Sequence, residues 1–192
     1  MTQLSDAQFF DALRAIVGAA HVLTQAADQE AFLIEPRGLW RGVALCVVRP
    51  SSTDEVSRVV ALCHREGRSV TPHGGGTGLV GGQIAQDARG IALSLARMNR
   101  LREVDAASNT MTVEAGVTLA AAQEAAIKAD RLFALSLASE GSCTIGGNLS
   151  TNAGGTAVLA YGNARDLTMG VEVVLADGRV MNALSKLRKD NT

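Results

Sequence analysis

Aromatic residues and prolines are scarce in this sequence of 192 residues. Phe, Trp and Tyr together make up 3% of the chain, and there are three prolines. Hydrophobic residues nevertheless make up 47% and charged residues 19%. A chain of this composition can bury a core of Ala, Val and Leu, which excludes an intrinsically disordered tail. Its length corresponds to one domain, or to one domain and part of another.

An excess of charge of one sign is also lacking. The 18 basic and 19 acidic side chains nearly cancel, so the sequence predicts no nucleic-acid partner. No apolar run approaches the roughly 18 residues that cross a bilayer, which predicts no membrane span. Asp6 and Asp11 stand where a secretion signal would carry positive charge. We therefore expect a cytoplasmic protein.

Cysteine and histidine are equally rare. Cys46, Cys63 and Cys143 lack the spacing of metal ligands, and their odd number argues against a full disulfide framework. We expect reduced thiols and no metal site. His21 and His64 are expected to be structural or surface residues.

Glycine, in contrast, is concentrated in two stretches. Six of the nine residues from Gly74 to Gly82 are glycine, and a second cluster lies between Gly141 and Gly155. Ordering glycine costs much backbone entropy, so a cluster needs a reason. The usual reason is a main chain that bends sharply and points its amides at an anion. Two such loops indicate a nucleotide cofactor.

Two common nucleotide sites do not fit the first stretch. Gly76, Gly78 and Gly81 match the dinucleotide-binding spacing, but residues 83–90 show no helical pattern and no acidic residue follows about 20 positions later. No Gly-Lys-Ser/Thr follows either, which excludes a P-loop.

Periodicity and capping residues predict the elements of the first half in the order helix, strand, helix, strand. The stretch 24–42 is irregular. The predicted elements are a helix from Ser5, which opens a capping box, to Gly18, a strand over 44–48, a helix that Ser52 caps, and a strand over 69–71 that leads into the first glycine stretch.

The second half predicts antiparallel hairpins. Residues 83–90 and 141–155 read as loops. The predicted elements are a strand over 90–95, paired strands over 101–104 and 111–114, a helix from Thr118 to Ala129, and a hairpin of 171–175 with 179–181 around Asp177-Gly178. Parallel elements followed by hairpins indicate an α+β protein with two subdomains.

Three ordered motifs resemble the FAD-linked oxidases, the flavoprotein fold shared by vanillyl-alcohol oxidase and p-cresol methylhydroxylase. They are 48–56, 72–79, and 143–148 followed by 152–155. Within that fold, residues 96–100, 141–143 and 187–192 are most similar to D-2-hydroxyglutarate and D-lactate dehydrogenases. The similarity covers the chain from Val43 to its C-terminus.

The resemblance implies an α+β fold of the p-cresol methylhydroxylase type, in which a small parallel β-α-β subdomain precedes a larger mixed or antiparallel sheet flanked by helices. We expect an N-terminal helix and lead-in segment over 1–42, and an FAD-binding domain over 43–192 that is truncated at its C-terminus. The family's substrate domain, with its active-site histidine and, in many members, metal ligands, is expected to be absent. No residue of this chain is therefore nominated as catalytic or metal-binding.

The resemblance also implies how the glycine stretches would hold FAD. The loop from His73 to Leu79 would wrap the pyrophosphate with backbone amides. Residues 141–155 would run beside the flavin ring and ribityl chain, and Tyr161-Gly162 would continue that wall. The predicted cofactor-binding residues are Pro72, His73, Gly74, Gly75, Gly76, Thr77, Gly78, Leu79, Gly82, Ser139, Gly141, Ser142, Cys143, Thr144, Gly146, Gly147, Asn148, Ser150, Thr151, Ala153, Gly154, Gly155, Tyr161 and Gly162.

Some relatives attach the flavin covalently to a histidine of this loop. That histidine follows the two glycines of an Arg-Ser/Thr-Gly-Gly-His run. Aligning the run places His73 at the arginine and Thr77 at the histidine. We therefore expect non-covalent FAD.

The predicted function is the FAD-binding part of a flavin-dependent D-2-hydroxyacid dehydrogenase. Its partner would be a small 2-hydroxy acid, which gives hydride from C2 to flavin N5 and becomes a 2-oxo acid. The electrons would pass to an acceptor other than oxygen that the sequence does not identify. Two alternatives stay open: a truncated, non-catalytic FAD-binding module, and a reductase of the same flavin fold with a nicotinamide donor, such as the cell-wall precursor reductase.

Overall fold

The computed structural model describes residues 3–186, which divide into two compact units. The first unit comprises residues 3–97 and 174–181, and the second comprises residues 98–173 and 182–186. The motif over 187–192 lies outside the described residues. The expected boundary between residues 42 and 43 stays a prediction.

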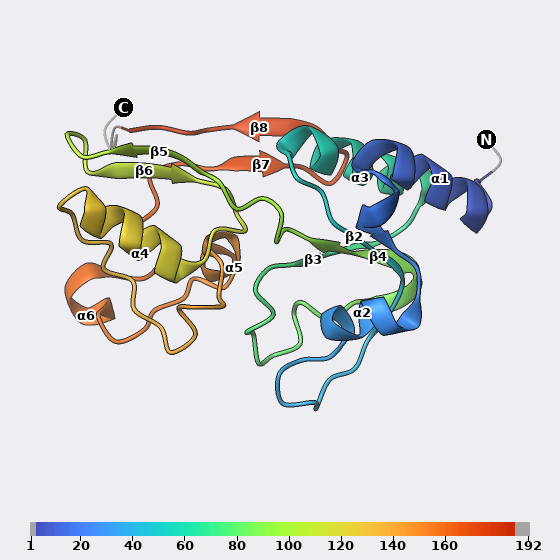
Figure 1. The fold of residues 1–192 in the computed structure, drawn as a ribbon, viewed down its shortest axis with the longest axis horizontal. Helices are drawn as coiled ribbons and strands as arrows, with labels where there is room; N and C mark the ends of the chain where they lie inside the picture. The colour runs from blue at the N-terminus through green and yellow to red at the C-terminus, as the bar shows by residue number, and fades with distance from the viewer. Residues whose placement is uncertain (1–2, 187–192) are drawn as a thin grey trace. The chain divides into compact units, whose positions relative to one another are not determined.

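A four-stranded mixed sheet forms the centre of the first unit (Figure 1). Strands β2 and β3 both run parallel to β4, while β1 runs antiparallel to β2. Because side chains alternate across a strand, Val47 faces one side of the sheet while Cys46 and Val48 face the other. The strands, in their order across the sheet, are β1 (Val22–Leu23), β2 (Val43–Val48), β4 (Gln86–Ser94) and β3 (Val70–His73).

Helices cover this sheet on both sides (Figure 1): α1 and α3 lie on one side, and α2 lies on the other. Phe32 and Leu33 of α2 pack against a cluster that contains Val47 and Ala92. Fully burying a side chain such as that of Val47 supplies about 1.5–3 kcal/mol. The bounds are α1 (Asp6–Val17), α2 (Ala26–Leu33) and α3 (Thr53–Glu66), with a short 3-10 helix η1 (Ala19–His21) after α1.

The predicted helix starts of the first unit are confirmed. Ser5 and Gln8 exchange the two bonds of a capping box, and the Ser52 hydroxyl accepts a hydrogen bond from the Glu55 amide at 3.2 Å. Helix α3 ends at Gly67, whose φ of 62° is the left-handed conformation that glycine adopts without a steric cost.

Two expectations for the first unit are wrong. The stretch 24–42 contains helix α2, which has little apolar periodicity and is stabilised by its packing on the sheet. The predicted loop 83–90 already contains the start of β4, because Gln86 and Asp87 pair with β2 at Val43 and Ala44. Pairing with β2 provides hydrogen-bond partners for the backbone of these polar residues. A sequence pattern alone does not indicate such pairing.

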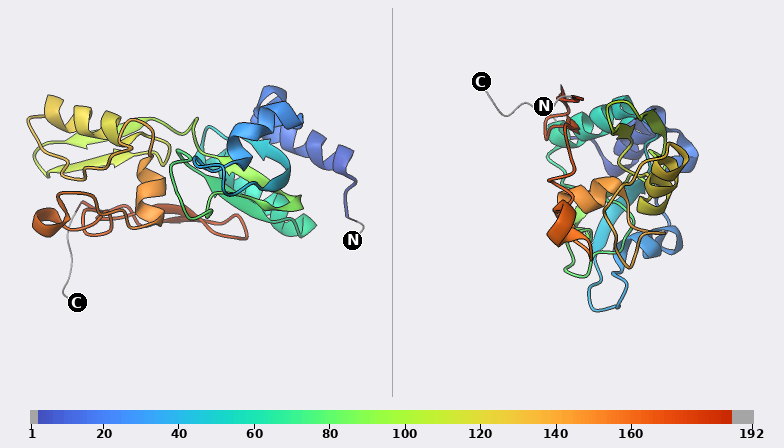
Figure 2. Two further views of the ribbon diagram at one scale, coloured as in Figure 1. Left: turned by 90° about the horizontal axis from the view of Figure 1, so that it is seen from below. Right: turned by 90° about the vertical axis from the view of Figure 1, so that its left-hand side faces the viewer.

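The second unit begins with the predicted hairpin of β5 (Leu101–Asp105) and β6 (Thr110–Val113), in which Val104 pairs with Met111. Helix α4 (Leu119–Lys128) lies over this hairpin (Figures 1 and 2). Its predicted cap is confirmed, since the Thr118 hydroxyl accepts a hydrogen bond from the Ala121 amide at 3.3 Å.

The sequence predicted a plain loop for the second glycine stretch, and this prediction is wrong. The stretch contains α5 (Ile145–Ser150), and α6 (Val158–Tyr161) follows it. The start of α5 is fixed by main-chain hydrogen bonds from Ile145 to Val117 (2.9 Å) and from Gly146 to Ala115 (2.9 Å). Contacts with a distant segment therefore order residues whose own helix propensity is low.

The last strands, β7 (Glu172–Val174) and β8 (Val180–Asn182), form the predicted hairpin. The Leu175 amide donates to the Arg179 carbonyl at 2.8 Å, and Gly178 takes a φ of 91° in the turn. The α+β class is thus confirmed. Within residues 3–186 the sheet sizes differ from expectation: the four-stranded sheet is the first one, because β4 pairs on both edges, while the later strands form two-stranded sheets.

All three cysteines are unpaired and buried, as expected for reduced thiols. Burial raises the pKa of Cys46 and of Cys63 to about 12. Since the thiolate is the reactive form, we expect no alkylation of either residue by iodoacetamide at pH 8 in the folded protein, and full alkylation in guanidinium chloride. Mass spectrometry of the labelled protein checks this, and native labelling of Cys46 or Cys63 would contradict the packing.

Candidate cofactor site

The first glycine stretch leaves the sheet at the carboxyl end of β3 and returns to it at β4. Ligands of open α/β sheets bind at such strand ends. No backbone amide from Gly74 to Gln83 donates a hydrogen bond to another residue in the described part of the chain. The loop therefore carries a run of free donors, which is the arrangement that binds a phosphate without a cation.

The conformation at Gly76 needs glycine. Its φ of 69° is left-handed, and an added Cβ would lie 3.2 Å from Cε1 of His73. The His73 ring is buried and packs edge-on against Phe32, with 5.3 Å between ring centres. Burial lowers the pKa of His73, so its ring is neutral at pH 7. The buried ring of His73 thus packs against the loop at Gly76.

Two carbonyls of the loop, unlike its amides, form hydrogen bonds with side chains of Arg37 and Gln83. The guanidinium of Arg37 donates to the carbonyl of Leu79, and Nε2 of Gln83 donates to the carbonyl of Gly78 at 2.7 Å. These bonds fix the loop from one side and leave the amides available.

Trp40 supports the same loop from a different segment. An added Cβ at Gly81 would lie 3.3 Å from Cδ2 of Trp40, so the indole lies directly against this glycine. The sequence did not single out Arg37, Trp40 or Gln83 as parts of the site. The only signal was that the one tryptophan lies in the stretch that was predicted to be irregular.

In the second unit, Thr144 and Asn148 are the buried polar residues of the predicted site, with 5% of each exposed. The Thr144 hydroxyl has no partner among the described residues, and a buried hydroxyl of this kind costs free energy until it is paired. The Asn148 amide donates to the sulfur of Cys143 at 3.5 Å. The free hydroxyl of Thr144 fits the expected contact with a cofactor.

Packing within the second unit, without any ligand, already explains why several positions of the second stretch are glycine. An added Cβ at Gly146 would lie 2.7 Å from the Cβ of Ala115, and one at Gly155 would lie 1.9 Å from the carbonyl oxygen of Ser136. These glycines allow segments of the same unit to approach each other. Cys143 likewise belongs to a hydrophobic cluster with Leu119, so its side chain faces the core.

The structure brings the predicted residues together in two groups, 72–82 in the first unit and 139–162 in the second. His73, Cys143, Thr144 and Asn148 are buried, whereas Pro72, Gly75, Gly78, Leu79, Gly82, Gly141, Ser142, Ser150, Thr151, Gly155 and Tyr161 are exposed. The half-buried residues are Gly74, Gly76, Thr77, Ser139, Gly146, Gly147, Ala153, Gly154 and Gly162. Their contacts with a cofactor stay a prediction.

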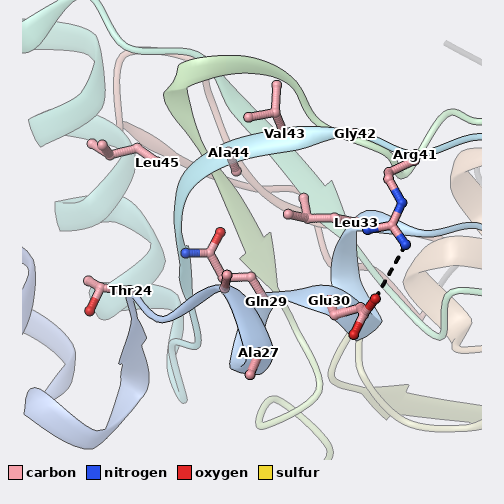
Figure 3. Close-up of a pocket in the computed structure, with 11 residues that line it drawn as sticks. Thr24, Ala27, Gln29, Glu30, Leu33, Arg41, Gly42, Val43, Ala44 and Leu45 are labelled. Atoms are coloured by element: carbon pink, nitrogen blue, oxygen red, sulfur yellow. Dashed lines mark hydrogen bonds and ion pairs between the residues drawn. The ribbon is translucent and has the colours of Figure 1, made fainter.

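The first unit also has a pocket of about 500 Å³ between α2 and β2 (Figure 3). An ion pair of Glu30 with Arg41, at 3.3 Å, lies at its edge, and Gln29 lines it with 6% of the residue exposed. None of the predicted cofactor residues lines this pocket.

Solved structures identify the fold as the p-cresol methylhydroxylase type. The chain superposes on alkyldihydroxyacetonephosphate synthase with a TM-score of 0.84 at 20% identity, over 96% of this chain and 39% of the other. It superposes on p-cresol methylhydroxylase with a TM-score of 0.70 at 23% identity, over 91% of this chain and 34% of the other.

The sequence then identifies the family. Residues 44–183 match the FAD binding domain family, and the chain belongs to it. The cofactor of the domain is accordingly FAD, as the resemblance to the FAD-linked oxidases implied.

Curated relatives are longer proteins. The chain is 43% identical over 152 residues to the mitochondrial D-2-hydroxyglutarate dehydrogenase of Bos taurus, covering 79% of this chain and 28% of that protein. It is 36% identical over 180 residues to D-2-hydroxyglutarate dehydrogenase of Xanthomonas citri, covering 94% of this chain and 38% of that protein. A putative D-lactate dehydrogenase of Schizosaccharomyces pombe, also mitochondrial, is 37% identical over 169 residues, covering 88% and 32%.

The expected cytoplasmic location is wrong. The relatives from Bos taurus, Danio rerio and Schizosaccharomyces pombe are named mitochondrial, which points away from the cytoplasm. The acidic residues Asp6 and Asp11 argue against a secretion signal but do not indicate a cytoplasmic location. No helix of residues 3–186 is long and apolar enough to cross a membrane.

Proposed function

We propose that this chain is the FAD-binding part of a flavin-dependent D-2-hydroxyacid dehydrogenase, with its FAD-binding domain over residues 43–192. The named activities of the relatives support this proposal. The structural observation that carries it is the run of unpaired amides from Gly74 to Gln83 within the part of the chain that matches the family.

In the proposed site, the chain's own residues bind and orient the cofactor. The amides from Gly74 to Leu79 would donate to the pyrophosphate, and each such bond to a charged group contributes about 1.5–3 kcal/mol. The hydroxyl of Thr144 would pair with a polar atom of the cofactor. Bound FAD would supply the flavin ring that accepts hydride from C2 of a small 2-hydroxy acid.

Non-covalent binding is part of the proposal. Nδ1 of His73 lies 3.1 Å from the Gly74 carbonyl, and its ring packs against the loop. This structural role agrees with the alignment that places His73 at the arginine, and not at the flavin-attaching histidine, of the Arg-Ser/Thr-Gly-Gly-His run. We expect the purified chain to show the two flavin absorption bands, and acid precipitation to release them into the supernatant. Bands that stay in the pellet would contradict non-covalent binding, and a chain that binds no added FAD would contradict the site.

A non-catalytic FAD-binding module is the second candidate. The predicted cofactor residues include no Asp, Glu, Lys or Arg, so none offers a carboxylate base or a cation for the substrate's carboxylate. Mixing the FAD-loaded chain with D-2-hydroxyglutarate or D-lactate without oxygen separates the two functions. Loss of the visible flavin band indicates hydride transfer, and an unchanged band with retained FAD indicates a module.

A further inference from the structure

Glu35 is a buried carboxylate that the proposed function does not use. The residue is 1% exposed, and it lies in a turn between α2 and β2. One carboxylate oxygen accepts from the Leu39 amide at 2.9 Å, and the other accepts from the amide of Arg37 at 3.0 Å and lies 3.5 Å from its Nε. The bond from the Arg37 amide lowers the pKa of Glu35, so the group is charged at neutral pH.

The main chain closes the same turn. The Glu35 amide donates to the Trp40 carbonyl at 3.0 Å, and the Gly38 amide donates to the Glu35 carbonyl at 2.8 Å. The carboxylate therefore fixes the path of the whole turn from residue 35 to residue 40. Both side chains that contact the glycine loop from this segment, Arg37 and Trp40, project from that turn.

The position of the glycine loop depends on its contacts with Arg37 and Trp40, because the amides of the loop form no hydrogen bonds of their own to any described residue. Arg37 holds the carbonyl of Leu79 and Trp40 lies against Gly81. A cofactor loop binds tightly only when it is held near its bound geometry before the ligand arrives.

We propose that Glu35 is a positioning residue for FAD binding: its carboxylate orders the turn that, through Arg37 and Trp40, holds the glycine loop with its amides open to the pyrophosphate. The inference rests on the proposed role of this loop. It assigns to Glu35 no contact with FAD.

Glu35→Gln tests it with little change of volume. The substitution replaces one carboxylate oxygen with an NH₂ group, which cannot accept a hydrogen bond. In either orientation of the new side-chain amide, this NH₂ group faces the backbone N–H of Arg37 or of Leu39, so one of these two donors loses its acceptor. We expect the emission of Trp40, the single tryptophan, to shift to longer wavelength and to be quenched more by acrylamide. The Kd for FAD should rise about tenfold.

Glu30→Gln is the matched control. Glu30 is a glutamate of the same region whose side chain is 60% exposed and pairs with Arg41. Its replacement should leave both Trp40 emission and the Kd for FAD unchanged, because exposed ion pairs contribute little.

Arg37→Met keeps the test decisive if Glu35→Gln folds poorly, because the Arg37 side chain is 47% exposed. It removes the bond to Leu79 and should also raise the Kd for FAD about tenfold. The double variant should bind FAD no more weakly than Glu35→Gln alone, since loss of the Glu35 carboxylate already releases the turn from which Arg37 projects. Additive effects would overturn the route through Arg37.

The outcomes separate this inference from the proposed function. Unchanged Trp40 emission in Glu35→Gln overturns the ordering role, whether or not FAD binds. Changed emission with an unchanged Kd overturns the link between the turn and the cofactor. If the unaltered chain binds no FAD, the proposed function of the loop fails, while the Trp40 measurements still decide whether Glu35 orders the turn.

Discussion

Gly76→Val is expected to weaken FAD binding by about 100-fold or more. Gly76 has a φ of 69°, which a β-branched residue avoids. Its first side-chain atom would also lie 3.2 Å from the buried ring of His73. The loop must move to relieve both, and loss of one or two charge-assisted amide bonds corresponds to this factor. Titration of the purified variant with FAD, followed by flavin fluorescence, measures the change.

Gly67→Val provides the control for backbone strain alone. Gly67 has a similar φ of 62° at the end of α3, and only the flexible end of Gln3 lies near its added Cβ. We expect both variants to lose stability, but only Gly76→Val to lose FAD affinity. Equal affinity of Gly76→Val and the unaltered chain would remove this loop from the cofactor site.

Gly155→Ala is expected to lower the melting temperature by about 10 °C. Its φ is 80°, and an added Cβ would lie 1.9 Å from the Ser136 carbonyl oxygen, with which this segment pairs. Left-handed strain of about 1–2 kcal/mol and a steric cost of about 1–3 kcal/mol add to roughly 3 kcal/mol. For a chain of this size each kcal/mol lowers the melting temperature by about 2–4 °C. Thermal unfolding followed by circular dichroism gives the value.

Gly141→Ala is the comparison in the same segment. Gly141 is exposed, and an added Cβ meets nothing within 4 Å. We expect its melting temperature to stay within about 2 °C of the unaltered chain. If Gly155→Ala instead melts normally and only loses FAD, Gly155 serves the cofactor and the packing explanation is wrong.

The elements that the sequence predicted well depend on residues close together in the chain. Ser5 and Ser52 cap helices through amides three residues later, and Gly178 closes a hairpin between neighbouring strands. Such interactions leave a short, readable pattern. Clustered glycine likewise leaves a short, local pattern, from which the sequence predicts a phosphate-binding main chain.

The elements that the sequence missed depend on contacts between distant segments. Helix α2 is stabilised by packing on the sheet, and α5 begins where residues 145 and 146 bond to residues 117 and 115. A local pattern contains no information about such partners. Gly155 was predicted as a cofactor-binding residue, and the structure adds a packing reason for glycine there, since an added Cβ would lie 1.9 Å from the Ser136 carbonyl oxygen.

By itself, the sequence determined the α+β class, the capped starts of α1, α3 and α4, the hairpins and the position of the first glycine loop, because each depends on patterns of neighbouring residues. Tertiary structure decided how that loop is held. Arg37 reaches the Leu79 carbonyl across 42 positions of the chain, and Trp40 lies against Gly81. Contacts at such separations form only when the whole unit folds, since the entropy of closing the intervening chain must be offset by the burial of a common core.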